Sequence, residues 1–254
     1  MILVQKIQIP ALPTKKPRRL YIYLPRDYPK NDTRYPVLYM FDGHNVFYDS
    51  HATYGKSWGM KEYLEKTRLP IILVAVECNH EGYRRISEYS PWDEKAPRPI
   101  GAVQGLGNVT MDWITKELKP MIDRTYRTIP DREHTLIAGS SMGGIMSIYA
   151  AVVYNEVFSK AAALSPVLWY GQKRIGEMIS SHPLLKPTQI YLDYGEGEAE
   201  KEGNVLEDLF STARKLTKAG AVVDARVVPG ALHSEAYWEQ RIPVFMPYLL
   251  GTNK

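Results

Sequence analysis

Residues 136–146 read Leu-Ile-Ala-Gly-Ser-Ser-Met-Gly-Gly-Ile-Met, and this stretch decides the fold. Its first three residues are apolar and predict a buried strand. Its last residues open a mostly apolar helix, which the sequence predicts to run to about Tyr154. Between strand and helix, Ser141 lies two residues after Gly139 and two before Gly143. The pattern is therefore a strand, a serine flanked by glycines, and a helix.

This pattern is typical of a nucleophile elbow, the tight turn that presents a reactive serine. Glycines are needed on both sides because a Cβ there would collide with the adjoining strand or helix. The turn holds the hydroxyl of Ser141 out at the carboxyl end of the sheet. The N–H of Met142 lies at the start of the helix, where it can stabilise an oxyanion. We expect Ser141 to be a nucleophile and Met142 to be an oxyanion donor.

A serine hydroxyl needs a base to accept its proton, and in elbow proteins the chain order is nucleophile, acid, histidine. Only His182 and His233 follow Ser141. His182 lies in a polar segment with no strand before it. His233 follows the expected strand 223–228 and a Pro-Gly turn, and it leads into the closing helix. We predict that His233 is the base.

The acid should follow the preceding strand, residues 189–194. The acidic residues in this region are Asp193, Glu196, Glu198, Glu200 and Glu202. Asp193 lies within the strand and would be held back from its tip. Glu198 comes three residues after the turn glycine Gly195 and has the reach to turn back toward the imidazole. We therefore favour Glu198, with Glu196 as the main alternative.

A second oxyanion donor normally comes from the loop after an earlier strand. Here the apolar strand 37–41 is followed by Asp42-Gly43-His44-Asn45. Gly43 would let the backbone turn so that an amide points into the site. We expect the segment Gly43–Asn45 to supply the donor, from the amide of His44 or Asn45. The alternative is that the side chains of these two residues line a substrate pocket.

Apolar runs alternate with amphipathic segments along the whole chain. The expected strands are 2–9, 19–24, 37–41, 71–77, 134–138, 159–164, 189–194 and 223–228. The expected helices are 58–66, 110–123, 143–154, 204–218 and one from Glu235 that Pro243 interrupts. This alternation predicts an α/β fold with a mostly parallel sheet covered on both faces, and the first two strands add an antiparallel edge. No repeat or linker divides the chain, so we expect one domain over residues 1–254.

Two segments show no periodicity and are expected to shape a substrate pocket. Residues 79–107 are predicted to form a long surface loop, and such loops are often functional. Residues 167–188 form a variable segment that contains Trp169. We include Trp169 among the candidate substrate-binding residues.

The composition is that of an ordinary globular protein, with 44% hydrophobic and 24% charged residues in 254. The net charge of +4 is mild, and apart from a small group at 15–19 the basic residues are spread along the chain. This pattern does not indicate a nucleic-acid partner. No apolar stretch approaches the ~18 residues that span a bilayer, and the start lacks the features of a signal peptide. We expect a cytoplasmic protein without a membrane partner.

No cofactor is expected from the motifs. The single cysteine, Cys78, ends an apolar run and is predicted to be a buried thiol. His44 and His51 are too far apart for one helical face and lack a third partner at ligand spacing, so no metal site is expected. The dinucleotide and phosphate-loop motifs are incomplete or absent. The sequence leaves open whether the protein is a monomer or a homodimer.

Further stretches match a known pattern of residues. They are 35–43, 57–60, 117–120, 126–128, 139–144, 164–166, 195–198 and 233–235 with Trp238. With these stretches the chain resembles the “Putative esterase” family of α/β hydrolases, the esterase-D-like group. That group includes siderophore trilactone esterases, feruloyl and acetyl-xylan esterases, and S-formylglutathione hydrolases. The resemblance covers nearly the whole chain and implies the α/β-hydrolase fold.

The resemblance implies a serine esterase with Ser141 as nucleophile and His233 as base. The acid of the family stands fourth in a Gly-x-x-Asp/Glu segment, which matches Glu198, although some siderophore-esterase relatives manage without a well-placed acid. An Arg-x-x-Glu-Tyr loop near the family's site is similar to residues 85–89. It implies a substrate role for Arg85 or Tyr89, with a structural ion pair as the alternative. An acyltransferase, a thioesterase or a non-catalytic binding protein on the same scaffold remain alternative hypotheses.

Overall fold

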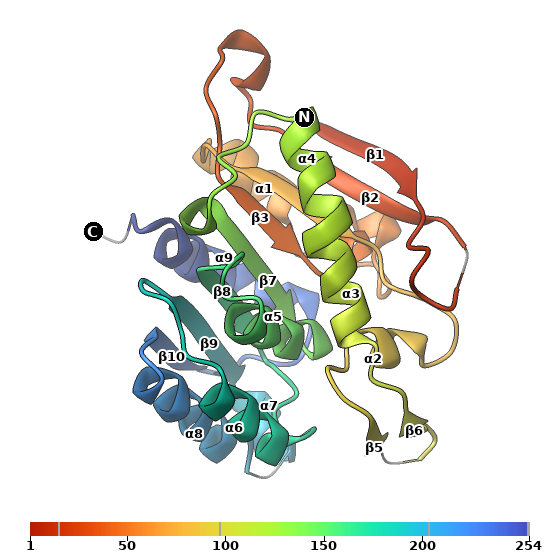
Figure 1. Ribbon diagram of the computed structural model, residues 1–254, viewed down its shortest axis with the longest axis vertical. Helices are drawn as coiled ribbons and strands as arrows, with labels where there is room; N and C mark the ends of the chain where they lie inside the picture. Colours follow the sequence, from red (N-terminus) through yellow and green to blue (C-terminus); the bar gives the residue numbers. More distant parts are fainter. Residues whose placement is uncertain (15, 97, 203, 253–254) are drawn as a thin grey trace. The chain divides into compact units, whose positions relative to one another are not determined.

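The structure is a computed structural model that describes residues 1–14, 16–96, 98–202 and 204–252. The chain divides into two compact units, residues 1–136 and 137–254 (Figure 1). The expectation of one domain over residues 1–254 stays a prediction.

The sheet of the first unit has the strand order β1-β2-β4-β3. Its strands are β1 (Ile2–Ile7), β2 (Arg18–Tyr23), β3 (Val37–Met40) and β4 (Ile72–Val76). β2 pairs antiparallel with both β1 and β4, whereas β3 pairs parallel with β4. The first four residues of β4 are completely buried, which explains their uninterrupted apolar character.

The helices of the first unit are α1 (Met60–Thr67), α2 (Arg84–Glu88), α3 (Gly107–Trp113) and α4 (Lys119–Thr125). A π-helical segment, Ile114–Leu118, joins α3 to α4, so the single helix expected over 110–123 is present with one irregular turn. Short 3-10 helices are η1 (Tyr28–Lys30), η2 (Gly43–Asn45), η3 (Asp49–His51) and η5 (Arg132–His134).

The prediction of a long surface loop over 79–107 needs correction. This segment contains α2 and a small antiparallel pair, β5 (Glu94–Ala96) and β6 (Gly101–Val103). These elements are too short to produce a visible periodicity. α2 is held in place by the buried Glu88, which accepts two hydrogen bonds from Arg18, 70 residues earlier. A long-range contact of this kind leaves no local signal in the sequence.

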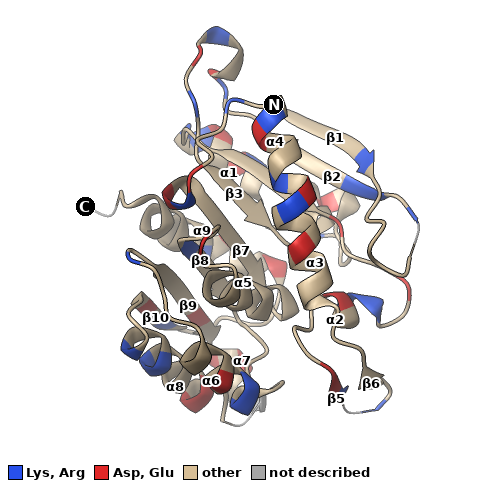
Figure 2. Cartoon of the chain, in the orientation of Figure 1, with Lys and Arg blue, Asp and Glu red and all other residues tan. Residues whose placement is uncertain are grey.

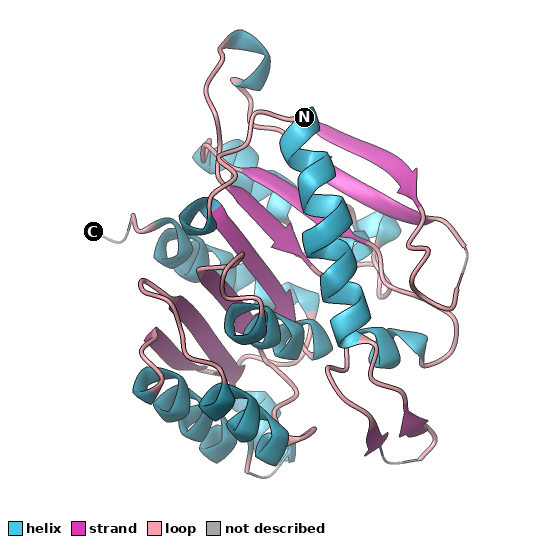
Figure 3. Cartoon of the chain, in the orientation of Figure 1, coloured by secondary structure: helices cyan, strands magenta, loops and turns pink. Residues whose placement is uncertain are grey.

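The second unit has the strand order β7-β8-β9-β10 (Figure 3). Its strands are β7 (Thr135–Ser140), β8 (Lys160–Leu164), β9 (Gln189–Gly195) and β10 (Val222–Val228), and β9 pairs parallel with both β8 and β10. Its helices are α5 (Met142–Val153), α6 (Gln172–Ser181), α7 (Glu196–Glu202), α8 (Val205–Lys218) and α9 (Glu235–Leu250). The predicted α/β class, mostly parallel with an antiparallel beginning, is confirmed.

Two helical predictions in this unit need correction. The expected interruption of the closing helix is absent, because α9 continues through Pro243 and Pro247. The buried residues of α9 contact β8 and β9, and this packing outweighs the hydrogen bonds that the prolines remove. α6 lies in the segment that the sequence left unassigned; its apolar contacts come from only two fully buried residues, Ile175 and Ile179.

The helices of the second unit differ in their content of charged side chains. α5, which contacts β8, carries no charged residue, whereas α8 carries acidic residues in its first turn and basic residues in its last turn (Figure 2). Within the described residues, no helix is both long enough and apolar enough to cross a membrane.

Candidate active site

The predicted elbow is a sharp turn between β7 and α5. Ser141 lies between the last residue of β7 and the first of α5, with φ +58° and ψ −123°. A residue with a Cβ adopts this left-handed region only at a cost in strain, which is often found at functional sites. Backbone bonds hold the turn. Ser141 N donates to Leu164 O at 3.0 Å, and Gly144 N donates to Ser141 O at 3.0 Å.

Gly139 and Gly144, on either side of Ser141, leave little room for a side chain. A Cβ on Gly139 would lie 2.7 Å from the carbonyl carbon of Gly143, inside the contact limit of real atoms. A Cβ on Gly144 would lie 3.0 Å from Pro166 Cα. The turn therefore closes only because the strand and the helix approach each other without side chains.

Met142 is the first residue of α5. Its N–H has no intrahelical acceptor, because the first amides of a helix find no carbonyl one turn earlier. The partial positive charge at a helix start favours a nearby anion. The geometry of Met142 is compatible with the oxyanion role that the sequence suggests.

His233 and Glu198 are brought together by the structure. His233 Nδ1 lies 2.7 Å from Glu198 Oε2. A carboxylate can only accept, so Nδ1 donates and Nε2 carries the free lone pair. The imidazole also meets the indole of Trp238 edge to face, with ring centroids 5.0 Å apart. The ring of His233 is thus fixed in both tautomer and orientation.

The other candidate acids face different partners. Glu196 Oε2 accepts a hydrogen bond from Gly230 N at 3.0 Å, which fastens the loop before His233. Asp193 lies inside β9 and accepts from Tyr191 and Arg241. The side chains of Glu200 and Glu202 lie outside the described residues. Among the described carboxylates, only that of Glu198 contacts His233.

Two residues that support Glu198 were missed in the sequence analysis. Ser165, directly after β8, donates from Oγ to Glu198 Oε1 at 2.7 Å. Arg241, from α9, donates to Ser165 Oγ at 2.9 Å and to Glu198 Oε1 at 3.2 Å. Both side chains are buried. A buried arginine within the apolar helix α9 was the available signal, because such a charge requires a partner.

These contacts set the electrostatics of the acid. Burial alone would raise the pKa of Glu198, but the hydrogen bonds from His233 and Ser165 hold that pKa below its usual value. For Asp193 burial has the larger effect and raises the pKa to about 6, against the attraction of Arg241. Glu198 is therefore the carboxylate held in its charged form beside the imidazole.

Backbone and side-chain contacts link the elbow to the acid and the histidine. Ser141 bonds to Leu164, the residue before Ser165, and Ser165 bonds to Glu198. In the described part of the chain, Ser141 Oγ and the ring of His233 are not hydrogen-bonded to each other. Catalytic hydrogen bonds are often long without substrate and shorten in the complex.

In the first unit, the segment after β3 differs in detail from the expectation. The residue with positive φ is Asp42, at +54°, and not Gly43. Gly43 is required because a Cβ there would lie 2.6 Å from the backbone of Ala75. Asn45 N donates to Asp42 O at 2.8 Å, so its amide is already engaged. The amides of Gly43 and His44 are the remaining candidates for the second donor.

Arg85 and Tyr89 hold Asp42. Arg85 makes two hydrogen bonds to the Asp42 carboxylate, at 2.8 and 2.6 Å, and Asp42 N donates to the hydroxyl of Tyr89. Burial opposes ionisation of Asp42, but the charge of Arg85 keeps its pKa below the usual value. These contacts support the structural alternative to a substrate role.

The remaining predicted substrate-binding residues differ in exposure. Asn45 is buried, and its Oδ1 accepts a hydrogen bond from Thr53 N at 3.0 Å. Trp169 is 48% exposed and contacts the ring of Tyr170 edge to face. Trp169 is therefore the member of this group whose large apolar surface is free to meet a ligand.

The chain belongs to the family described as “Putative esterase”, whose sequence profile matches residues 13–249. The resemblance seen in the sequence is confirmed, and the protein is an enzyme that acts on esters.

Three individual proteins illustrate the similarity. The chain is 23% identical over 248 residues to “Uncharacterized protein YbbA” of Bacillus subtilis, covering 93% of this chain and 94% of that protein. It is 27% identical over 138 residues to the iron(III) salmochelin esterase of Escherichia coli, covering 49% of this chain and 33% of that enzyme. An IroE-like serine hydrolase from Shewanella oneidensis superposes with a TM-score of 0.79 at 20% identity, covering 98% of this chain and 79% of that one. This similarity confirms the α/β-hydrolase fold.

Proposed function

We propose that this chain is a serine carboxylic-ester hydrolase that acts through Ser141, His233 and Glu198. The observation that carries the proposal is the 2.7 Å hydrogen bond between His233 Nδ1 and the buried carboxylate of Glu198. This bond leaves Nε2 of His233 able to accept the proton of a serine. The strained backbone of Ser141, in a turn closed by glycines, supports its role as nucleophile.

The proposed reaction has two halves. Ser141 Oγ attacks the ester carbonyl while His233 takes its proton, and the N–H of Met142 donates to the resulting oxyanion. The intermediate collapses when His233 protonates the departing alcohol. A water molecule, deprotonated by His233, then attacks the acyl-enzyme and releases the acid and free Ser141.

The proposed substrate is a small-molecule or carbohydrate-linked ester, such as a siderophore lactone, a feruloyl ester or an acetyl ester. The similarity to an iron(III) salmochelin esterase supports the first of these. The exposed indole of Trp169 is compatible with an aromatic acyl group. Values of kcat/KM for acetyl, butyryl, feruloyl and trilactone esters would rank these classes.

The test of the nucleophile is Ser141→Ala, with Ser140→Ala as the matched control. Ser140 is the adjacent residue of β7, and the residues two positions before and after it are not glycines. We expect Ser141→Ala to lower kcat for p-nitrophenyl acetate by about a million-fold, as when one member of a catalytic unit is lost. The Ser140 variant should keep its turnover and its labelling by a fluorophosphonate. Near wild-type turnover by Ser141→Ala would overturn the proposal.

A further inference from the structure

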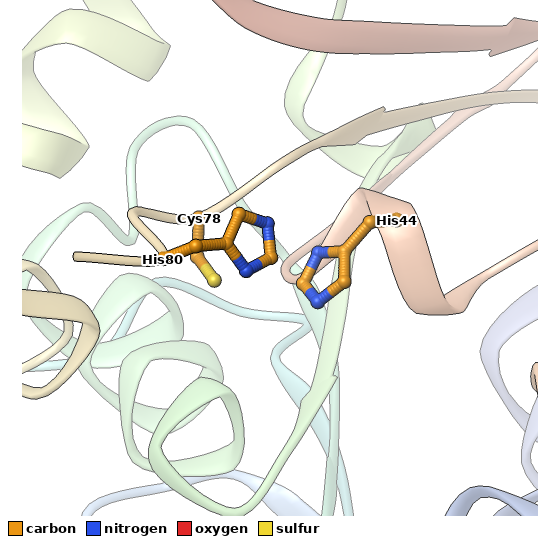
Figure 4. A group of neighbouring side chains, drawn as sticks. All are labelled: His44, Cys78 and His80. Carbon is orange, nitrogen blue, oxygen red and sulfur yellow. The ribbon is translucent and has the colours of Figure 1, made fainter. Parts of the chain in front are cut away.

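Three strong metal-binding side chains converge in the first unit. They are His44 from η2 and Cys78 and His80, which follow β4 (Figure 4). One ligand atom from each lies within 4.8 Å of the other two. In Figure 4 the ring of His80 lies between the sulfur of Cys78 and the ring of His44. No metal site was expected from the sequence, because His44 and His51 lack a third partner at ligand spacing; the cluster instead joins His44 to residues more than 30 positions later.

The fold creates this cluster by the close approach of two loops. The segment that begins at Gly43 lies against the end of β4, where a Cβ on Gly43 would come 2.6 Å from Ala75 and 2.9 Å from Val76. His44 follows Gly43 directly, and Cys78 comes two residues after the end of β4. His44 and Cys78 are both buried, and the more exposed His80 covers them.

Each imidazole already has a hydrogen-bond partner for one of its nitrogens. His80 Nε2 lies 3.0 Å from Glu77 Oε1, and His44 Nε2 lies 3.0 Å from Thr53 Oγ1. When these Nε2 atoms carry the proton, the two Nδ1 atoms keep their lone pairs. Metal-ligating histidines nearly always have such a second partner, which fixes the tautomer and the ring.

The other nitrogen of His44 is the strongest sign of a ligand. Its Nδ1 is buried and has no hydrogen-bond partner within the described residues. Only 2% of His44 is exposed, so bulk water does not solvate this atom. A buried polar atom without a partner is costly and needs an explanation. A metal ion between the rings and the thiol would provide one.

We propose that His44, Cys78 and His80 form a binding site for a zinc ion. Tetrahedral zinc with bonds of about 2.0–2.3 Å places its ligand atoms about 3.3–3.6 Å apart. In the structure these ligand atoms are up to 4.8 Å apart, so the largest separation has to shorten by about 1 Å when the ion binds. Rotation of the half-exposed His80 side chain can supply this movement. The Cys78 thiol transfers its proton to solvent as the sulfur–zinc bond forms, and water completes the fourth position.

The donor set selects the metal class. A thiolate with two imidazoles suits zinc and similar transition metals, whereas magnesium and calcium prefer oxygen ligands. A bound ion would tie η2 to the chain after β4. The side chain of His44 would hold the metal, whereas its backbone amide is a candidate oxyanion donor, and the metal titration does not depend on the role assigned to Ser141.

The experiment uses the full chain, freed of metal with a chelator and titrated with Co²⁺ and then with Zn²⁺. We expect one Co²⁺ per chain, with a thiolate-to-cobalt charge-transfer band and the intense visible bands of tetrahedral coordination, both removed by Zn²⁺. Calorimetry then gives the Zn²⁺ affinity of each variant. His80→Ala should weaken Zn²⁺ binding by more than about 100-fold, and Thr53→Val by about 10-fold or more, the usual cost of losing a histidine's second partner.

The matched control is His134→Gln. His134 is also a partly exposed histidine of the first unit with a carboxylate partner, Asp131, but it lies outside the cluster. Its variant should bind Zn²⁺ as the wild type does. Cys78→Ser should abolish the charge-transfer band. If this buried variant does not fold, the variants at the more exposed His80 and Thr53 still test the site. The absence of a thiolate band in the wild type, or unchanged Zn²⁺ affinity in His80→Ala, would overturn the proposal.

Discussion

Ser165 donates a 2.7 Å hydrogen bond to Glu198 Oε1, the oxygen of Glu198 that does not face His233. Gly195 N and Arg241 donate to the same oxygen, at 3.1 and 3.2 Å. Three donors thus hold one oxygen of the carboxylate while the other contacts the imidazole. The position of the acid is determined by residues from the ends of β8 and β9 and from α9.

Ser165→Ala tests whether Ser165 positions the acid. The change removes the hydrogen bond from Ser165 to a buried charge and the 3.1 Å hydrogen bond that Ser165 accepts from Trp238. We expect a loss of about 1–3 kcal/mol in the free energy of unfolding. The pKa of Glu198 should rise, since one of its donors is lost. The acid limb of the kcat/KM profile for p-nitrophenyl acetate should then move to higher pH.

Ser159→Ala is the control for this prediction. Ser159 lies just before β8, as Ser165 lies just after it, and its buried hydroxyl has no partner among the described residues. This variant should keep the wild-type pH profile. An equal shift of the acid limb in both variants would show a general effect of altering β8, and would contradict a positioning role for Ser165.

Glu198→Gln separates the two candidate acids. Glutamine keeps the size of the side chain but cannot hold the imidazole in the required tautomer as a carboxylate does. We expect kcat to fall by about 10⁴-fold, as for the acid of other serine triads. Glu196→Gln should change kcat little, because an amide oxygen can still accept from Gly230 N. Steady-state kinetics of the two variants would contradict the assignment if their effects were reversed.

Arg241→Met tests the buried ion pairs. Arg241 faces two carboxylates, those of Asp193 at 2.8 Å and Glu198 at 3.2 Å, and it is 2% exposed. Its removal leaves buried charges without a partner, and we expect a loss of about 3–5 kcal/mol in the free energy of unfolding. Urea denaturation measures this loss.

Arg226→Met is the matched control, because Arg226 forms a more exposed pair with Asp224 and should cost less than about 1 kcal/mol. Adding Asp193→Asn to Arg241→Met should restore part of the lost stability, since it removes one of the uncompensated charges. A loss below about 1 kcal/mol for Arg241→Met, as expected for Arg226→Met, would show that Arg241 does not stabilise the buried carboxylates.

The pH dependence of stability follows from Glu198. Its folded-state pKa is lowered, so its contribution to stability is complete above the unfolded value of about 4.3 and is lost as pH falls through the folded value. The difference in the free energy of unfolding between wild type and Glu198→Gln should be constant from about pH 6 to 8 and should shrink below about pH 4. A difference that grows on acidification would mean that the pKa of Glu198 is raised instead.

Trp169→Ala tests the exposed indole as a substrate contact. Stacking on an aromatic ring is worth about 0.5–1.5 kcal/mol beyond area burial, so KM for a feruloyl ester should rise by about 2–10-fold. KM for a small acetyl ester should change little. Tyr54→Ala, at another exposed aromatic residue, is the control. Equal changes in KM for both esters would argue against an aromatic subsite at Trp169.

The sequence by itself determined the elements whose signal is local. The glycine spacing around Ser141 predicted a turn that excludes side chains, and Gly139 does pack against the backbone of Gly143. The apolar runs predicted the strands because a buried strand needs uninterrupted hydrophobic residues. The order of nucleophile, acid and histidine indicated His233, and the position after Gly195 favoured Glu198 over Glu196; the structure joins His233 and Glu198 by a hydrogen bond.

Only the tertiary structure decided which distant residues meet. Arg241 and Ser165 are 76 positions apart, and only the packing of α9 against β8 brings the guanidinium to the serine hydroxyl. His44 meets Cys78 because the close approach at Gly43 brings η2 against the end of β4. Hydrophobic periodicity records which face of an element is buried, but it does not record what that face is buried against. Contacts between residues far apart in the chain therefore had to come from the fold.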